Sequence, residues 1–391
     1  MAKKRIGIFT GGGDVPGLNI AIKSVVLNAC EDDYDVIGIR RGWGGLLNYE
    51  IGNQESHNKY IRPLTPFEVR RVDRSGGTFL HTSRTNPSHV RPREVPEFLK
   101  DSPKGKVVNE ETGAKDYTEH ILEVLEHLGI DSLITIGGDD TLSYSVQLHK
   151  AGFPVVGIPK TMDNDVLGTD YCIGFSTAVT QAVSLITHFR TSVGSHERIG
   201  VVELFGRNSG ETSLITGYLS YVDRTIICEV PFNLVDLSEM LAKDKKDSPS
   251  HYSICVISEG AVTDSGLIVE SGEEDAYGHK KLGGIGDLLS EQIKILTGNN
   301  TMYQKLGYLL RSGPADMLDR MVAMNYGALA MQMTKRKDFG NMVSIMDGNY
   351  SEVPLEMVTS GKRQVDVDLY YDSVNYRPKI KNILGLPMFL H

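Results

Sequence analysis

Residues 132–165, SLITIGGDDTLSYSVQLHKAGFPVVGIPKTMDND, contain the pattern that decides the fold. The apolar run Ser132–Ile136 predicts a strand, and Val155–Ile158 predicts a second one. Between them, Thr141–Ala151 predicts a helix that ends at Gly152. Strands that alternate with helices predict a parallel sheet with right-handed crossovers. We therefore predict an α/β fold.

The same order of strand, polar loop and helix occurs on both sides of this stretch. Ile6–Phe9 predicts a strand, and Leu18–Ala29 predicts the helix after it, with apolar residues at helical spacing. In the second half, Ile199–Phe205 and Ser253–Ile257 predict further strands, each followed by a polar loop. We predict two Rossmann-like lobes with mainly parallel sheets and an active site in the cleft between them.

Each predicted lobe combines two parts of the chain. We expect one lobe to contain residues 1–174 and about 315–365. The other would contain residues from about 175–314 and 366–391.

The sequence also supports predictions for four shorter segments. Residues 86–117, rich in proline and charge, and residues 262–285, rich in glycine and acid, look like insertions. Lys243–Lys246, with acids around it, predicts a solvated loop. Thr118 is expected to cap a helix that ends at Gly129.

Two pairs of carboxylates follow strands that we expect to be neighbours. Asp139–Asp140 and the pair Asp163 and Asp165 should face one cleft, because ligands bind beyond the carboxyl ends of parallel strands. Mg²⁺ takes one or two carboxylates plus phosphate oxygens, and a remaining carboxylate can act as a general base. With the cation of Lys160 and the hydroxyl of Thr161 beside them, the set suits phosphoryl transfer. Helix caps or solvated turns are the alternative interpretation.

Glycines and arginines add groups that bind anions. Gly11–Gly17, with the sequence GGGDVPG, predicts either a phosphate cradle of backbone amides or an ordinary tight turn. The P-loop pattern GxxxxGK[ST] is absent from the sequence. The planar fork of arginine matches phosphate oxygens, although any single arginine can be an ordinary surface residue. Four arginines stand near glycine-bearing loops: Arg84, Arg198, Arg207 and Arg311.

The composition narrows the class of protein. The 391 residues include 41 Lys+Arg against 50 Asp+Glu, a net charge of −9, so neither nucleic acid nor an anionic membrane is an expected partner. No run of about 18 apolar residues occurs, and the first residues lack the apolar stretch of a signal peptide. The four cysteines are widely spaced without a CxxC pattern, which favours neither a metal site nor disulfides. We expect a cytoplasmic protein.

Five motifs together resemble the phosphofructokinase A family. They occur in the family's order and spacing, and the similarity is strong from residue 4 to about residue 230. The resemblance implies a Mg²⁺-dependent phosphotransferase that acts on the 1-hydroxyl of fructose 6-phosphate and gives fructose 1,6-bisphosphate. The motifs are GGGDVPGLN from Gly11, GGDDT from Gly137, PKTMDND from Pro159, GTDYCIGF from Gly168 and FGR from Phe205.

The resemblance also implies a role for each site residue. Asp163 would remove the proton from the sugar hydroxyl, Thr161, Asp165 and Arg207 would assist at the transferring group, and Asp139 would hold Mg²⁺. The family's donor positions fall on Gly13, Arg84, Asp140, Thr141 and Lys160. Its sugar-phosphate positions fall on Thr161, Asp163, Arg198, Phe205, Gly206, Arg207, Glu259, Tyr308 and Arg311. The resemblance also implies that the lobe with residues 1–174 binds the phosphoryl donor and that the other lobe binds the sugar phosphate.

Asp140 and Lys160 bear on the identity of the phosphoryl donor. ATP-using members of the family usually carry glycine at the position of Asp140 and often at that of Lys160, so the Asp–Lys combination resembles the pyrophosphate-dependent members. A carboxylate and a long cationic side chain would fill space that a nucleotide needs. We therefore expect pyrophosphate as donor and a reversible reaction. An ATP-dependent 6-phosphofructokinase and a kinase of another sugar phosphate are alternatives. A non-catalytic regulatory subunit is disfavoured because the carboxylates are all present.

Two positions depart from the family pattern. The family usually has arginine where this chain has Met302 and histidine where it has Tyr308, and both normally contact the sugar 6-phosphate. Lys305 is a candidate substitute for the arginine, and otherwise the acceptor differs from fructose 6-phosphate or fructose 6-phosphate binds weakly. By resemblance, Arg198 reaches a neighbouring subunit, so we expect a homodimer or a homotetramer.

Overall fold

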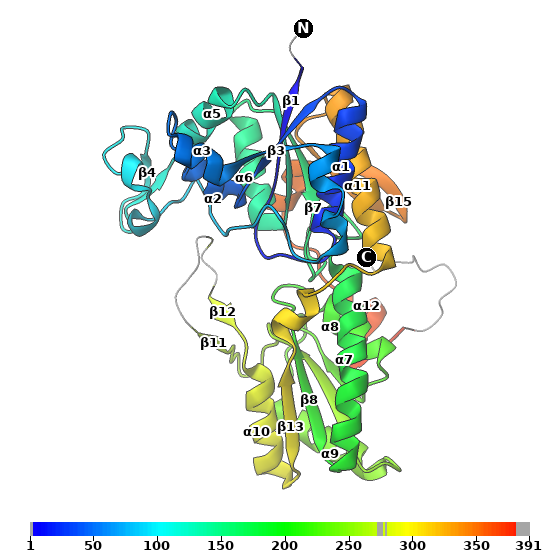
Figure 1. Cartoon of the computed structure of the whole chain (residues 1–391). Helices are drawn as coiled ribbons and strands as arrows, with labels where there is room; N and C mark the ends of the chain where they lie inside the picture. The colour runs from blue at the N-terminus through cyan, green and yellow to red at the C-terminus, as the bar shows by residue number, and fades with distance from the viewer. Residues whose placement is uncertain (1–2, 272–276, 278–279, 381–391) are drawn as a thin grey trace.

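The computed structural model describes residues 3–271, 277 and 280–380. Figure 1 shows two lobes stacked along one axis, each built around a sheet with helices beside it. The amino-terminal half of the chain forms most of the upper lobe, and α7 (Phe175–Ser195) runs from the junction to the far end of the lower one.

The upper lobe contains a seven-stranded sheet in the order β15-β14-β7-β6-β1-β2-β3. Its central strands pair in parallel, and only the edge strands β3 and β15 pair antiparallel with their neighbours. Every residue of β6 is buried, as is typical of a central strand covered on both faces. The strands are β1 (Arg5–Thr10), β2 (Asp35–Ile39), β3 (Ile61–Leu64), β6 (Ser132–Gly137), β7 (Val155–Pro159), β14 (Asn341–Met346) and β15 (Asn349–Pro354).

Helices cover both faces of this sheet. They are α1 (Leu18–Glu31), α2 (Gly42–Leu47), α3 (Gln54–Tyr60), α4 (Pro66–Val69), α5 (Thr118–His127), α6 (Asp139–Lys150) and α11 (Met317–Arg336). Ile8 lies in the core that the sheet forms with α1 and α11. The next residue, Phe9, points to the opposite face, where its ring packs 4.4 Å from that of Trp43. Alternation along one buried strand thus supplies two apolar cores.

The lower lobe contains a four-stranded sheet in the order β13-β8-β10-β9, and all its pairings are parallel. The strands are β8 (Ile199–Leu204), β9 (Arg224–Ile226), β10 (Ser253–Ser258) and β13 (Thr301–Lys305). The helices beside it are α7, α8 (Glu211–Leu219), α9 (Leu234–Asp247) and α10 (Ile285–Thr297). The mainly parallel α/β architecture is therefore as predicted, whereas the residue boundaries between the lobes stay a prediction.

The segment after β15 returns to the lower lobe. It passes η5 (Leu355–Thr359), and Lys362 forms a backbone bridge with Val166, which follows β7. Beyond it, Tyr370 and Tyr371 are buried in the core of the lower lobe. The remaining elements of this segment are α12 (Val367–Tyr370), β16 (Tyr371–Asp372) and β17 (Arg377–Pro378).

Short elements fill the two segments that looked like insertions. The first contains η2 (Pro92–Glu94), η3 (Glu97–Leu99) and the antiparallel pair β4 (Lys106–Asn109) and β5 (Ala114–Asp116). The second contains the antiparallel pair β11 (Glu270–Ser271) and β12 (Lys281–Leu282). Two further 3₁₀ turns are η1 (Val72–Arg74) and η4 (Gly307–Arg311).

Two local predictions were wrong. Lys243–Lys246 lies within α9, not in a loop, because Asn233 caps the helix and Leu237 and Leu241 bury one face of it. Thr118 is the first residue of α5 and does not cap it; its hydroxyl donates a 2.6 Å hydrogen bond to Asp116 instead.

Candidate active site

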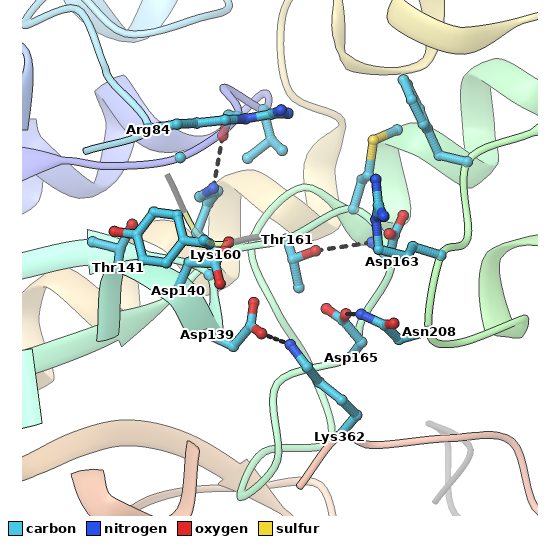
Figure 2. A pocket seen from close by; sticks show the side chains of 18 of the residues that line it. Arg84, Asp139, Asp140, Thr141, Lys160, Thr161, Asp163, Asp165, Asn208 and Lys362 are labelled. Carbon is cyan, nitrogen blue, oxygen red and sulfur yellow. Dashed lines mark hydrogen bonds and ion pairs between the residues drawn. The ribbon is translucent and has the colours of Figure 1, made fainter. Parts of the chain in front are cut away.

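A cavity lies where the carboxyl ends of the two sheets face each other. Its walls come from the loops after β1, β6 and β7 in the upper lobe and after β8 and β10 in the lower lobe. Figure 2 shows acidic and basic side chains pointing into this space. The lining residues are Gly12, Gly13, Val15, Arg84, Gly138, Asp139, Asp140, Thr141, Lys160, Thr161, Met162, Asp163, Asp165, Phe205, Arg207, Asn208, Glu259, Tyr277, Arg311 and Lys362.

Two cations lie against the glycine loop that follows β1. The ammonium of Lys160 donates a 2.6 Å hydrogen bond to the carbonyl of Gly13. Burial, then the nearby charge of Arg311, lowers the pKa of Lys160 to about 8. A Cβ at position 13 would lie 2.2 Å from Nη1 of Arg311, so only glycine lets this guanidinium approach the backbone. The glycines therefore make room for cations as well as for a ligand.

Three acidic side chains gather on the opposite wall. Burial raises the pKa of Asp163, and the charges of Asp165 and Glu259 raise it further. Its Oδ1 is buried and has no hydrogen-bond partner among the described residues. Burial also raises the pKa of Asp165, against the effect of its contact with Asn208 at 3.5 Å, and the pKa of Glu259 to about 7. The surroundings therefore disfavour the ionised form of each of these three carboxyl groups.

A buried polar frame fixes the loop that carries these acids. Asn164 adopts a left-handed backbone conformation, with φ of 54°. Its side-chain amide donates to the carbonyl of Asp170 at 2.9 Å, and its side-chain oxygen accepts from the backbone of Cys172 at 2.8 Å. Arg363 donates a 3.0 Å hydrogen bond to the carbonyl of Asn164 and forms a buried ion pair with Glu211. These contacts hold the carboxylates on either side of Asn164 in place.

The residues fit a divalent cation that is shared with a ligand. Asp139 and Asp165 line the cavity from the segments that follow two adjacent strands, and Asp163 lines it too, with an Oδ1 that has no hydrogen-bond partner among the described residues. No three His, Cys, Asp or Glu side chains in the described part of the chain form a complete metal cage. Mg²⁺ is commonly held in this way, by one or two carboxylates together with substrate phosphate oxygens.

A second cavity adjoins the first on the lower lobe. Tyr308 and Arg311 line it with Phe205, and the guanidinium of Arg311 lies 4.5 Å from the ring of Tyr308 and 5.1 Å from that of Phe205. Lys305 also lines it but pairs with Glu203 at 2.8 Å. This cavity presents cations and aromatic rings next to the acidic wall.

Comparison with known proteins identifies this arrangement. The phosphofructokinase family model matches residues 5–334. The chain belongs to the phosphofructokinase family. It is thus a glycolytic transferase, and its relatives support a fructose 6-phosphate phosphotransferase.

The relatives of this phosphofructokinase divide between two donors. An ATP-dependent 6-phosphofructokinase of Chloroflexus aggregans is 37% identical over 354 residues, which cover 90% of each chain. A pyrophosphate–fructose 6-phosphate 1-phosphotransferase of Thermoproteus tenax is 37% identical over 364 residues, covering 92% of this chain and 95% of the relative. A solved pyrophosphate-dependent phosphofructokinase from Marinobacter aquaeolei shares the fold, with a TM-score of 0.73, 18% identity, and coverage of 96% of this chain and 88% of that one. The two-lobed α/β fold is therefore confirmed, and overall similarity leaves the donor open.

The phosphofructokinase cavity brings together most of the residues singled out in the sequence. Tyr308 lines only the adjoining cavity. Gly206 directly follows Phe205 of the lining and has φ of 136°. Arg198 precedes the first residue of β8, whereas the cavity lies beyond the last, about 20 Å away at the rise of a strand. Within one chain, Arg198 therefore does not reach the site.

Sequence reasoning missed three lining residues that lie outside the quoted motifs. Asn208 lies in the polar loop after β8, and a closer reading of that loop could have found it. Tyr277 donates a 2.8 Å hydrogen bond to the carbonyl of Thr85 and so connects the two lobes. Lys362 forms an ion pair with Asp139, as Figure 2 shows, and neither a strand nor a glycine motif precedes it.

No helix in residues 3–271, 277 and 280–380 combines the length and apolar character that a membrane span requires.

Proposed function

We propose that this phosphofructokinase transfers a phosphoryl group from pyrophosphate to the 1-hydroxyl of fructose 6-phosphate. The products are fructose 1,6-bisphosphate and inorganic phosphate, and the reaction is reversible and Mg²⁺-dependent. The proposal includes a cytoplasmic location and a homodimer or homotetramer.

The observation that carries the donor assignment is the position of Lys160. Its buried ammonium lies against Gly13, where a donor phosphate would otherwise approach the glycine backbone. Asp140 lies on the same cavity wall, in the first turn of α6. A nucleotide would bring its α-phosphate and ribose toward that carboxylate, whereas pyrophosphate ends within reach of the cation. Charge and volume therefore favour the short donor.

The geometry supports a direct transfer with Asp163 as the base. Asp163 accepts the proton of the 1-hydroxyl, the sugar oxygen forms a bond to the near phosphorus, and the bond from that phosphorus to the bridging oxygen breaks. The second phosphate leaves with the bridging oxygen. Because burial raises the pKa of Asp163, its carboxylate is a stronger base than an exposed aspartate. The Thr161 hydroxyl and the Arg207 guanidinium contact the transferring oxygens in this scheme.

Asp139 and Asp165 would hold Mg²⁺ together with donor oxygens. The bound ion would supply positive charge to the phosphate oxygens during transfer.

The sugar phosphate would occupy the adjoining cavity. Glu259 would accept hydrogen bonds from sugar hydroxyls, and Arg311 would bind the 6-phosphate beside Tyr308. Phe205 and Gly206 would border the sugar, and Arg198 of a second subunit would complete the phosphate site. The Lys305–Glu203 ion pair competes with a role for Lys305 at the phosphate.

ATP is the second candidate donor, because an ATP-dependent enzyme of Chloroflexus aggregans and a pyrophosphate-dependent enzyme of Thermoproteus tenax are each 37% identical to this chain. Initial rates of the purified protein with pyrophosphate, ATP and ADP, each against fructose 6-phosphate and other sugar phosphates, distinguish the two. We expect turnover with pyrophosphate and fructose 6-phosphate. Turnover with ATP and none with pyrophosphate would establish the ATP alternative. Appreciable turnover only with another sugar phosphate would reassign the acceptor.

A further inference from the structure

Lys362 places a cation at the carboxylate end of the cavity, opposite Lys160. Its ammonium forms an ion pair with Asp139, and both side chains line the cavity (Figure 2). The Lys362 side chain is 30% exposed, so solvent and ligands can reach it. It comes from residues 360–366, far along the chain from the loops that carry the other lining groups.

The backbone at Lys362 is fixed by the same frame that holds the acidic loop. Residue 362 forms a bridge with Val166, and the backbone N–H of Arg363 donates to the carbonyl of Asp165 at 3.0 Å. The Arg363 side chain is anchored to the carbonyl of Asn164 and to a buried carboxylate. Only the long aliphatic stem of Lys362 is free to redirect its ammonium.

The numbers of acidic and basic side chains that line the cavity suggest that the Lys362 ammonium binds an anionic ligand. The lining contains five carboxylates and, without Lys362, four cationic side chains among the described residues. A polyphosphate bound to such a lining would face one more carboxylate than cation. Lys362 makes the two sets equal in number, and a bound divalent cation would then leave the cavity net positive.

We propose that Lys362 is a donor-binding residue whose ammonium contacts the phosphate oxygens of the bound donor. The inference rests on the proposed function in that this cavity binds the donor. Asp139 is also a proposed Mg²⁺ ligand, so in the loaded site the ammonium exchanges this carboxylate for donor oxygens a short distance away. Because the backbone at Lys362 and Arg363 is fixed, the exchange would come from rotation of the Lys362 side chain.

Calorimetric titration measures the contact without turnover. Wild type and Lys362→Met are titrated with imidodiphosphate, a non-hydrolysable pyrophosphate analogue, and separately with a non-hydrolysable ATP analogue, all with Mg²⁺. For the donor analogue that wild type binds, we expect Lys362→Met to weaken binding by about 10- to 100-fold, the usual effect of losing a charge-assisted contact. Lys362→Arg should retain most of the affinity. The control is Lys150→Met, which removes an exposed lysine paired with Glu356 at 2.8 Å on the surface.

The outcomes separate this inference from the choice of donor. If the wild-type protein binds only the ATP analogue, the result contradicts pyrophosphate as donor. The affinity of Lys362→Met is then compared with that of wild type for the ATP analogue. Unchanged or tighter donor binding in Lys362→Met overturns the inference and makes Lys362 a counter-ion of Asp139 alone. If Lys362→Met does not fold, Lys362→Gln supplies the same measurement. A matching rise in the KM of the donor, with the KM of the sugar phosphate unchanged, is the expected kinetic result.

Discussion

Substitution of Asp163 by asparagine should abolish most of the activity while stabilising the fold. Asparagine keeps the shape of the side chain but cannot accept the hydroxyl proton. A positioned general base is worth roughly 10²–10⁴ in rate, so kcat should fall by that factor with little change in KM. The result is measured as initial rates at saturating donor and acceptor.

The gain in stability follows from the surroundings of Asp163. Its Oδ1 is buried without a partner among the described residues, and two other carboxylates, Asp165 and Glu259, raise its pKa. Removing an incompletely compensated buried charge should raise the free energy of unfolding by about 1–3 kcal/mol. Differential scanning calorimetry should therefore show a higher melting temperature for Asp163→Asn than for wild type.

Asp101→Asn is the matched control, because Asp101 is exposed. It should change neither kcat nor the melting temperature. Near-normal kcat in Asp163→Asn would remove this residue from the proton transfer. A lower melting temperature would show that the Asp163 carboxylate is well compensated in the empty site, contrary to the reasoning above. Opposite changes in activity and stability are the expected signature of a group kept for function.

Two further predictions concern donor choice and the sugar-phosphate site. Asp140→Gly should admit ATP and weaken the preference for pyrophosphate in paired initial-rate assays. Adding Lys160→Gly should lower pyrophosphate use further and non-additively, because both side chains line one cavity; unchanged donor preference in the double variant would refute this interpretation. Arg311→Ala should raise the KM for the sugar phosphate by about 10- to 100-fold, the usual effect of losing a charge-assisted contact. Arg198→Ala should do the same through the subunit interface, and a fully active monomer in sedimentation would contradict that.

The sequence was sufficient to predict that the carboxylates of Asp139 and Asp163 line one cavity, because the signals for it are local. Asp139 and Asp163 each follow a strand within one strand–loop–helix unit, and parallel pairing of those strands brings both loops to one edge. Lys362 could not be found in this way. It reaches the cavity only because the chain, after completing the upper sheet, returns beside residue 166. No periodicity or motif encodes such a contact between distant segments.

Two other positions also depend on contacts between distant parts of the protein. The acids and lysines near residue 245 looked like a loop by charge, but the buried face of α9 decides the structure through Leu237 and Leu241. Arg198 was assigned by resemblance to the site of a neighbouring subunit, and its place before the first residue of β8 leaves that assignment a prediction. A run of charged residues indicates that a segment is exposed to solvent. It does not indicate whether the segment is a helix or a loop, or which residues contact another subunit, because both depend on which surfaces are buried.

The raised pKa of Glu259 predicts that binding of the sugar phosphate and stability of the fold change in opposite directions with pH. Burial raises its pKa to about 7, against the opposing charges of Lys305 and Arg207. The ionised carboxylate is the better acceptor for sugar hydroxyls. From pH 6 to pH 8 the ionised fraction increases from about 0.1 to about 0.9 for a group with this pKa, so the KM for fructose 6-phosphate should fall by up to about tenfold. The measurement is KM for the sugar phosphate at several pH values with the donor saturating.

Glu259→Gln separates this effect from the titration of the substrate phosphate, which also ionises near pH 6. The variant should have a higher KM at pH 8 and a flatter pH profile; a profile that matches wild type would exclude Glu259 as the titrating group. The contribution of Glu259 to the free energy of unfolding should change with pH in the opposite direction. Because the pKa of Glu259 in the folded protein is raised, its contribution to stability is complete below the unfolded value of about 4.3 and is lost as the pH rises through about 7. Relative to wild type, Glu259→Gln should therefore gain stability from pH 5 to pH 8, over the same range in which wild type gains affinity for its sugar.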